Sequence, residues 1–245
     1  MKLQLPSVTL ICIDGLNVTR AINVLEICKS KCDFGAVKLL THLPTDYEHK
    51  IEILPLKTLT AYSIFMLTKF NEYIDTEHAL VVQRDGFILN IEAWKDEWLQ
   101  YDYIAPLFVQ YNLVGSGGFS LRSKKLIDAV AKVMPTWNGT QEHADEIQDF
   151  LGFYEDGVIS FKFHEKFNFA PLEEAADFAA GGNVNLEYYR PFPFGFHGAR
   201  QNVNHKTGFV FPTCHHTEGE CLCVQSQLNY LTKLETLKYS NGNLS

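Results

Sequence analysis

The stretch ALVVQRDGF, residues 79–87, decides the fold class and raises the question of function. A run of apolar residues that includes two adjacent valines is typical of a strand buried on both faces of a sheet. Gln83, Arg84 and Asp85 follow this run, before Gly86. In open α/β sheets ligands bind beyond the carboxyl ends of the strands, so Asp85 lies where a ligand would bind. An Asp-Gly pair also favours a tight turn on its own, and both interpretations stand.

Strand-like and helix-like segments alternate around that stretch. Continuous apolar runs predict strands at 8–13, 36–40, 51–54 and 78–82. Helical spacing of apolar residues predicts helices at 19–31 and 62–74. The pattern predicts an α/β fold with a mostly parallel central sheet flanked by helices. Because Asp14 ends the first of these strands, it is expected at the same crevice as Asp85.

The second half of the chain is less regular. The sequence predicts a short helix at 92–100, a glycine-rich turn at 114–123 that leads into a strand, and a helix capped by Ser123. Residues 140–163 predict two helical stretches broken near Gly152.

Length and charge limit the classes of function. The 245 residues, 46% of them hydrophobic, fit one domain, predicted at 1–225, with a polar tail at 226–245. A net charge of −8 argues against a nucleic-acid partner. No apolar stretch reaches the length of a membrane span, and the N-terminal run does not resemble a signal peptide. We therefore expect a cytoplasmic protein with reduced cysteines.

Three further groups of residues could carry chemistry. Gly115, Gly117 and Gly118 either form a simple bend or let the backbone approach a ligand closely. Glu155 and Asp156 either cap a helix through its dipole or supply a general base, and Asp156 is the favoured base. His197, between Gly195 and Gly198, is either a packed residue or a metal ligand held out on a loop.

A cysteine- and histidine-rich segment lies near the C-terminus. Its potential zinc ligands are Cys214, His215, His216, Cys221 and Cys223. Structural zinc sites usually join two separated ligand pairs, and this spacing matches no standard finger or ribbon. A surface loop that is rich in these residues is the favoured interpretation, and a zinc-stabilised interaction protein is the alternative.

Six motifs occur together in one order: ALVVQRDGFILN, WLQYDYIAP, VGSGGFSLRS, YEDGVISF, FAPLEEAADFA and PFGFHG. In this combination the chain resembles a glycosyltransferase-like family catalogued as a domain of unknown function, number 5672. The resemblance runs from about Val8 to Gly198. That family is similar to the GT-A class of nucleotide-sugar glycosyltransferases, which have one α/β domain and a metal-dependent diphosphate site.

The resemblance implies a role for each motif. Gln83, Arg84 and Asp85 occupy the place of the Asp-x-Asp signature, so Asp85 would bind Mn²⁺ or Mg²⁺ bridging the donor diphosphate, with His197 as the second ligand. The glycine-rich turn would line the sugar and acceptor side. The pair at 155–156 would supply the catalytic base, and residues 13–14, Ile13 and Asp14, would contact the nucleoside. The implied partners are a nucleotide-sugar donor and a glycan or other hydroxyl acceptor.

Three positions depart from the family pattern. Gln83 replaces the first carboxylate of the metal signature, Leu107 replaces an aromatic residue, and Ser116 stands where Asn is usual. The Ser116 change is expected to alter an amide contact with a sugar hydroxyl. The loss of a carboxylate at Gln83 keeps an alternative open, in which the chain is a non-catalytic carbohydrate- or nucleotide-binding module on a degenerate transferase fold.

Overall fold

The computed structural model describes residues 1–108, 111–181, 190, 193–198, 203–204 and 209–210. Contacts divide the chain into two units, residues 1–197 and 198–245. In the second unit the described residues form a two-stranded ladder of β12 (Val203–Asn204) and β13 (Phe209–Val210). The predicted boundary between domain and tail, at 225–226, lies outside the described residues.

A six-stranded sheet forms the centre of the first unit, with the strand order β3-β2-β1-β4-β9-β6. Its strands are β1 (Leu3–Ile13), β2 (Cys32–Thr41), β3 (Lys50–Glu52), β4 (His78–Val82), β6 (Tyr103–Ile104) and β9 (Phe119–Ser123). The strands β3, β2, β1 and β4 are parallel to one another, and β9 pairs antiparallel with both β4 and β6. All residues of β4 and β9 are buried, as expected for strands covered on both faces.

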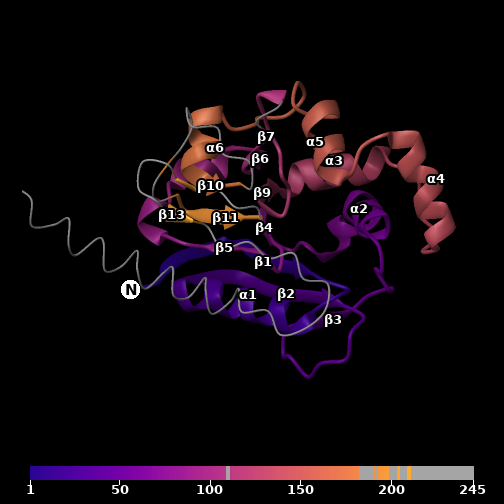
Figure 1. The fold of residues 1–245 in the computed structure, drawn as a ribbon, viewed down its shortest axis with the longest axis horizontal. Coiled ribbons are helices and arrows are strands. Elements are labelled where there is room, and N and C mark those ends of the chain that lie inside the picture. The colour runs from indigo at the N-terminus through magenta and orange to yellow at the C-terminus, as the bar shows by residue number, and fades with distance from the viewer. Residues whose placement is uncertain (109–110, 182–189, 191–192, 199–202, 205–208, 211–245) are drawn as a thin grey trace, which may run out of the picture. The chain divides into compact units, whose positions relative to one another are not determined.

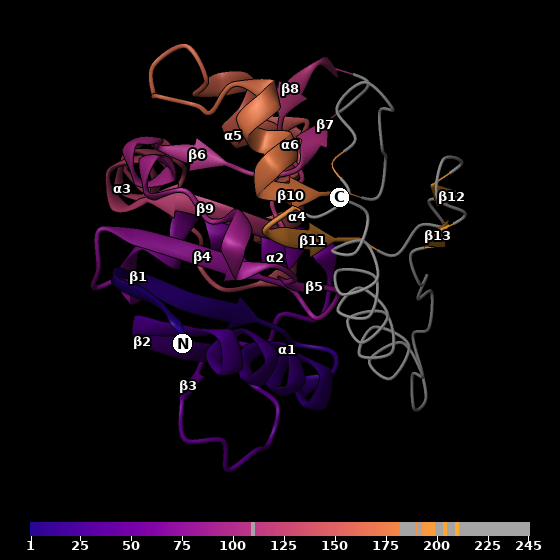
Figure 2. The ribbon, with the colours of Figure 1, turned by 90° about the vertical axis from the view of Figure 1, so that its left-hand side faces the viewer.

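Helices cover both faces of this sheet. In Figures 1 and 2, α1 (Val18–Lys31) lies on one face, while α2 (Leu59–Thr68) and α3 (Lys124–Val133) lie on the other. The helices α4 (Gln141–Leu151) and α5 (Glu155–Lys162) follow on the side of α2. None of the described helices is long and apolar enough to cross a membrane.

Two smaller sheets lie beside the central one. β10 (Ala179–Ala180), β11 (Gly195–His197) and β5 (Gly86–Ile88) form a three-stranded sheet, and β7 (Leu107–Phe108) pairs with β8 (Leu113–Val114). The helix α6 (Leu172–Phe178) precedes β10, and 3₁₀ turns occupy Phe70–Tyr73, Ile91–Ala93 and Asp96–Gln100. Trp98, fully buried, packs against Phe178 and Phe194 at ring-centroid distances of 5.3 and 5.9 Å, which anchors these elements.

The predicted α/β fold is confirmed, with differences at several element ends. β1 begins at Leu3 rather than at residue 8, because its first half alternates between buried and exposed positions and lacks a continuous apolar run. The helix predicted at 62–74 ends at Thr68 and gives way to a 3₁₀ turn. The segment 92–100 forms two 3₁₀ turns instead of one helix.

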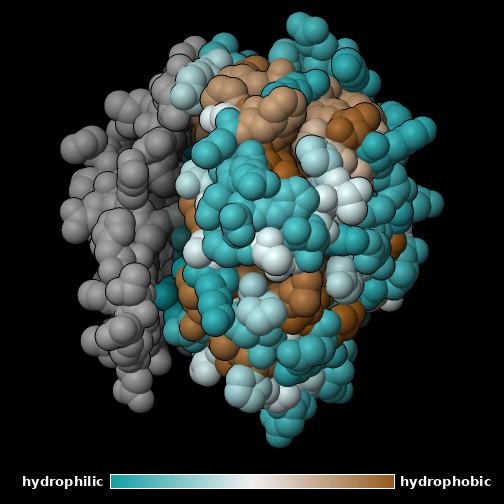
Figure 3. Space-filling view, turned by 90° about the vertical axis from the view of Figure 1, so that its right-hand side faces the viewer, coloured by the Kyte–Doolittle hydropathy of each residue, from teal (hydrophilic) through white to brown (hydrophobic). Residues whose placement is uncertain are grey.

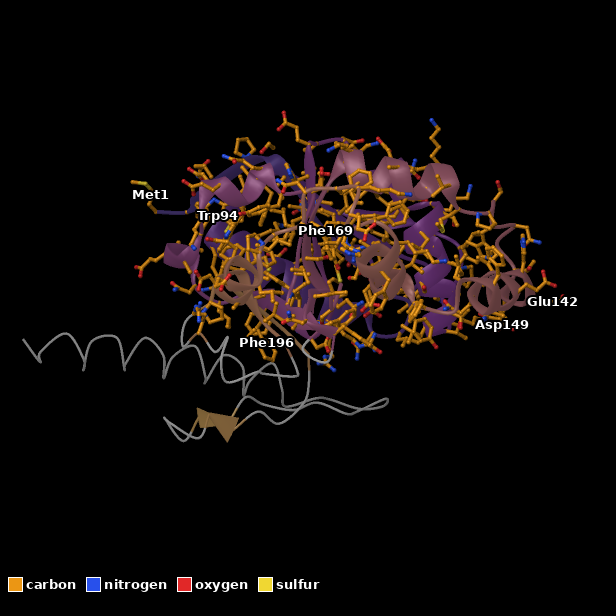
Figure 4. The ribbon with its side chains drawn as sticks, turned by 90° about the horizontal axis from the view of Figure 1, so that it is seen from above. Met1, Trp94, Glu142, Asp149, Phe169 and Phe196 are labelled. Carbon is orange, nitrogen blue, oxygen red and sulfur yellow. The ribbon has the colours of Figure 1, made fainter. Side chains whose placement is uncertain are left out.

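The predicted helix caps are also confirmed. The hydroxyl of Ser123 accepts a hydrogen bond from the backbone N–H of Leu126 at 3.0 Å, at the start of α3. Gly152 ends α4 in the left-handed region with φ 74°, which explains the break between the two helical stretches. In Figure 4, Glu142 and Asp149 of α4 lie at one end of the molecule and Met1 at the other.

Apolar residues also reach the surface near α4 and α5. Phe150, Phe153 and Tyr154 are exposed there, and Figure 3 shows apolar residues scattered among hydrophilic ones on the face it presents. The cysteines in the described part of the chain, by contrast, are internal: Cys12, Cys28 and Cys32 are buried and free.

Candidate functional site

The ends of three strands meet at one edge of the central sheet. Cys12 of β1 pairs in register with Val82 of β4, so the residues after both strands emerge side by side. β9 runs the opposite way and begins beside Val82, which brings the glycine-rich turn to the same edge. The backbone N–H of Gln83 donates to the carbonyl of Gly118 at 2.8 Å. Asp14 and Asp85 therefore lie at the same edge of the sheet, as predicted, and the glycine-rich turn lies next to Gln83.

Asp14 is engaged within the protein. Its Oδ1 accepts hydrogen bonds from the backbone N–H groups of Leu16 and Asn17, both at 2.7 Å. Its Oδ2 accepts one from Arg84 at 2.9 Å, and only 3% of the Asp14 side chain is exposed. Asp14 thus fixes the turn into α1 and orients Arg84, and its carboxylate has little capacity left for a ligand.

A cavity of about 320 Å³ opens between these strand ends and the start of α2. Its lining combines apolar side chains, cations and two carboxylates. The lining residues are Ile13, Asp14, Gly15, Leu16, Leu56, Lys57, Thr58, Leu59, Tyr62, Gln83, Arg84 and Asp85. Four of the predicted binding residues, Ile13, Asp14, Gln83 and Arg84, are among them. A volume of this size suits a small organic ligand.

Asp85 and His197 face each other beside this cavity. His197 on β11 pairs with Gly86 on β5, so the fold places it next to Asp85. Nε2 of His197 lies 3.7 Å from Oδ1 of Asp85, and their side chains are 17% and 28% exposed. Two residues 112 positions apart in sequence (197 − 85) are therefore neighbours and partly open to solvent.

The glycine-rich turn makes room for these side chains. A Cβ added at Gly118 would overlap Nε2 of His197 and lie 2.6 Å from Oε1 of Gln83. A Cβ added at Gly117 would lie 2.6 Å from Oε1 of Glu155. Neither glycine has a left-handed backbone, so close approach, and not positive φ, is what requires glycine here.

Gln83 is held by two partners. Its Nε2 donates to the hydroxyl of Tyr62 at 3.0 Å, which turns Oε1 toward Nε2 of His197 at 3.3 Å. Burial raises the pKa of Tyr62, so this hydroxyl stays neutral. The amide of Gln83 therefore presents an oxygen to the same space that Asp85 and His197 face.

Glu155 is a buried member of the carboxylate pair at the start of α5. Its Oε1 accepts a hydrogen bond from Nη2 of Arg122 at 3.2 Å, and both residues are less than 5% exposed. Burial, with a contribution from the neighbouring Asp156, raises the pKa of Glu155 to about 7. Arg122 also donates to the carbonyl of Gly117 at 3.0 Å, so it joins the glycine-rich turn to α5.

Asp156 is the more accessible carboxylate. Its Oδ1 accepts a hydrogen bond from the backbone N–H of Gly157 at 2.8 Å, and its side chain is partly exposed. Its Cβ lies near Gly117, on the same turn that borders His197. The structure thus brings the predicted acidic pair and the predicted metal ligands to either side of residues 117–118.

A divalent cation would find two protein ligands here. Within the described ranges no group of three or more His, Cys, Asp or Glu side chains could hold a metal ion. Oδ1 of Asp85 and Nε2 of His197, 3.7 Å apart, are close enough to share one cation whose ligand distances are about 2.1 Å. Mg²⁺ is commonly held by one or two carboxylates together with substrate phosphates, so the donor set fits a cation that arrives with a diphosphate.

Comparison with known proteins places the chain in a family. The model of a family described as protein of unknown function, DUF5672, matches residues 49–197, more than half of the chain. The chain belongs to this family. The match begins after β2, whereas the resemblance based on motifs extended back to Val8. No curated protein matches the chain.

Solved structures include chains that are similar in fold at a low level. The galactosyltransferase LgtC, in complex with donor and acceptor sugar analogues, gives a TM-score of 0.45 at 12% identity, over 77% of this chain and 86% of that chain. A likeness of this size carries no information about the reaction of the DUF5672 protein.

Sequence reasoning missed two residues of the site and expected a different contact for a third. Tyr62, which orients Gln83, and Arg122, which pairs with Glu155, were missed, whereas Ser116 contacts His197 and was expected to affect a sugar hydroxyl. Arg122 stands within the VGSGGFSLRS motif, so its position was a usable signal. Tyr62 lies on an apolar helix face and carries no such signal. The cysteine- and histidine-rich segment at 214–223, for which the sequence favours a surface loop over a zinc site, lies outside the described residues.

Proposed function

We propose that this DUF5672 protein is a metal-dependent glycosyltransferase that moves a sugar from a nucleoside-diphosphate donor to an acceptor hydroxyl. The observation that carries the proposal is the pairing of Asp85 with His197, 3.7 Å apart, at a cavity where β1 and β4 end. The motifs that resemble the GT-A class supply the same residues independently. The acidic pair on the other side of Gly117–Gly118 adds a group that can accept a proton.

Asp85 and His197 would hold Mn²⁺ or Mg²⁺. When bound, such a cation neutralises negative charge on the diphosphate leaving group, a Lewis-acid effect that lowers the barrier by several kcal/mol. Gln83 turns a neutral oxygen toward the same space, where the GT-A signature carries a carboxylate. Of residues 83–85, only Asp85 therefore offers a negative charge to the cation, and the donor diphosphate would supply the remaining negative charge.

The cavity would take the nucleoside and its phosphates. Leu16 and Leu59 line it with exposed apolar surface that suits a base or a ribose face. Arg84 and Lys57 line it with positive charge that suits phosphate oxygens. Asp14 orients Arg84 through its salt bridge, so its part in donor binding is indirect.

Asp156 would act as the general base. As the acceptor oxygen attacks the anomeric carbon, the bond from that carbon to the phosphate oxygen breaks, and the acceptor proton passes to the Asp156 carboxylate. Glu155 is less suited to this role because it is buried and bonded to Arg122. General-base assistance of this kind is typically worth about 10²–10⁴-fold in rate.

The experiment is a transfer assay. The full chain is incubated with a panel of nucleotide sugars, glycan acceptors and Mn²⁺, and release of nucleoside diphosphate is measured together with the mass of the product. We expect acceptor-dependent release by the wild-type protein, a loss of about 10²-fold or more in D156N, and retained donor binding in that variant. Wild-type turnover in D156N would refute the assignment of the base.

A non-catalytic binding module is the second candidate function, and the hydrogen bonding of Gln83 favours it. Nε2 of Gln83 donates to the hydroxyl of Tyr62, and Oε1 lies 3.3 Å from Nε2 of His197, so the Gln83 amide has hydrogen-bonding partners without a metal. In that case a nucleotide or sugar would bind without turnover, and D156N would bind it as the wild type does. Acceptor-dependent release of nucleoside diphosphate excludes this candidate.

A further inference from the structure

Ser116 has a left-handed backbone conformation that the neighbouring glycines do not adopt. It is a non-glycine residue with φ 55°, in the left-handed region, whereas Gly115, Gly117 and Gly118 beside it all avoid that region. Left-handed backbone disfavours residues with a Cβ, and strain of this kind often marks functional sites. A serine where glycine would fit more easily indicates that its side chain has a task.

The side chain of Ser116 contacts the ring of His197. Its Oγ lies 3.0 Å from Nδ1 of His197, the nitrogen that faces away from Asp85. The opposite nitrogen, Nε2, lies 3.3 Å from Oε1 of Gln83 and 3.7 Å from Oδ1 of Asp85. Ser116 is therefore the hydrogen-bonding partner at the rear of the ring.

The ring is also confined at its front edge. The missing Cβ of Gly118 leaves the space that Nε2 occupies, because an added methyl group would overlap that atom. Rotation of the ring would exchange Nδ1 with a carbon atom and break the contact with Ser116. The hydroxyl at the rear and the glycine at the front thus select one orientation of the imidazole.

We infer that Ser116 is a positioning residue that holds His197 with Nε2 directed at a divalent cation beside Asp85. The inference rests on the proposed function. A serine hydroxyl both donates and accepts, so it donates to Nδ1 when Nε2 carries the proton and accepts from Nδ1–H when Nε2 binds a cation. Histidine ligands of metals almost always donate their other ring N–H to an oxygen acceptor, and the hydroxyl of Ser116 can serve as one.

This role differs from the one expected for this position, an altered contact with a sugar hydroxyl. The Ser116 hydroxyl points at a protein side chain 81 residues further along the chain. Asparagine, the usual residue of the family motif, also tolerates left-handed backbone and also donates and accepts hydrogen bonds. The same task could therefore be carried by either side chain.

The test measures binding of Mn²⁺ alone to the full chain, by electron paramagnetic resonance of the free ion during titration. The variants are S116A, S116G, S116N and H197A. We expect S116A and S116G to weaken Mn²⁺ binding by about 10–100-fold, the usual effect of losing a partner of a metal-binding histidine. S116N is expected to retain most of the affinity.

S116G separates positioning from a structural role. Glycine relieves the left-handed strain at residue 116, so the melting temperature of S116G should equal or exceed that of the wild type while Mn²⁺ binding falls. Wild-type Mn²⁺ affinity in both S116A and S116G, with binding lost in H197A, would overturn this inference alone. Equal Mn²⁺ binding by H197A and the wild type would instead overturn the metal site of the proposed function.

Discussion

Arg122 donates a hydrogen bond to Glu155 across 3.2 Å in the interior of the protein, where neither side chain is more than 5% exposed. Arg122 also donates to the hydroxyl of Ser120 at 2.9 Å and to the carbonyl of Gly117 at 3.0 Å. One guanidinium thereby joins the glycine-rich turn, which borders His197, to the start of α5, where Asp156 lies. Buried pairs of this kind are costly to desolvate.

This relationship predicts a pH dependence of stability. The pKa of Glu155 is raised to about 7 in the folded protein, above its ordinary value of 4.5. Between these two values the folded state holds a proton that the unfolded state has released, so the free energy of unfolding falls as the pH rises through this window. The expected fall is on the order of 2 kcal/mol between pH 5 and pH 8.

Urea unfolding of wild type and E155Q at pH 5 and pH 8 measures this contribution. His78 opposes it, because burial lowers its pKa and its contribution to stability is lost as the pH falls. E155Q is the control, because it lacks the titrating carboxyl group of Glu155 and retains His78. A pH dependence of stability that is the same in both proteins would contradict the assignment.

Gly118→Ala should displace His197. The added methyl group overlaps Nε2 of the ring and crowds Oε1 of Gln83, so the ring must turn away from Asp85. We expect Mn²⁺ binding to fall to the level of H197A, as measured by the same titration. Gly152→Ala is the control for Mn²⁺ binding only: no atom lies within 4 Å of its added Cβ, but its left-handed backbone, with φ 74°, makes the change destabilising, so melting temperatures are not compared. Mn²⁺ binding by G118A at the wild-type level would show that His197 does not bind the metal from this position.

Asp14→Asn should destabilise the protein far more than Asp85→Asn. Asp14 accepts two backbone hydrogen bonds and pairs with Arg84 in a buried position, so D14N should lower the free energy of unfolding by about 2–4 kcal/mol. Asp85 is more exposed, and D85N should change stability by less than about 0.5 kcal/mol. Urea unfolding of both variants at pH 7 measures the contrast. A stable D14N protein would mean that Asp14 is free to serve a ligand.

Gln83→Glu should strengthen metal binding. The substitution keeps the shape of the side chain and places a carboxylate 3.3 Å from Nε2 of His197, where the wild type has an amide oxygen. Two unit charges about 4 Å apart attract by about 1 kcal/mol even at the dielectric constant of water, so a second carboxylate beside a doubly charged cation should raise Mn²⁺ affinity by at least about tenfold. Unchanged Mn²⁺ affinity in Q83E would place the cation away from Gln83.

The sequence predicted the strands of the central sheet better than the side-chain contacts at the edge of that sheet. Apolar runs such as 78–82 identified the buried parallel strands, because a strand covered on both faces consists mostly of apolar residues. The placement of Asp85 and His197 side by side followed only from the family resemblance, since their contact depends on the pairing of β5 with β11. Local pattern carries no signal for such a pairing.

Asp14 shows that local sequence pattern also does not determine the role of a side chain. Its position at the end of β1 was predicted, but the two backbone N–H groups and the guanidinium that occupy its carboxylate come from the turn at 16–17 and from Arg84. A strand-end carboxylate that binds a ligand and one that holds a turn have the same sequence signature. The three-dimensional arrangement separates them.

The central claim is tested most directly by the thermal stability of the purified wild-type and D85N proteins with nucleoside diphosphates and nucleotide sugars, each with and without Mn²⁺. A ligand that binds only the folded state raises stability by about 2.7 kcal/mol at a hundredfold excess over Kd. We predict an increase in melting temperature for the wild type with one class of nucleotide, dependent on Mn²⁺ and absent in D85N. An equal increase in D85N, or one that does not depend on Mn²⁺, would contradict the role of Asp85 as the metal ligand that holds the donor diphosphate.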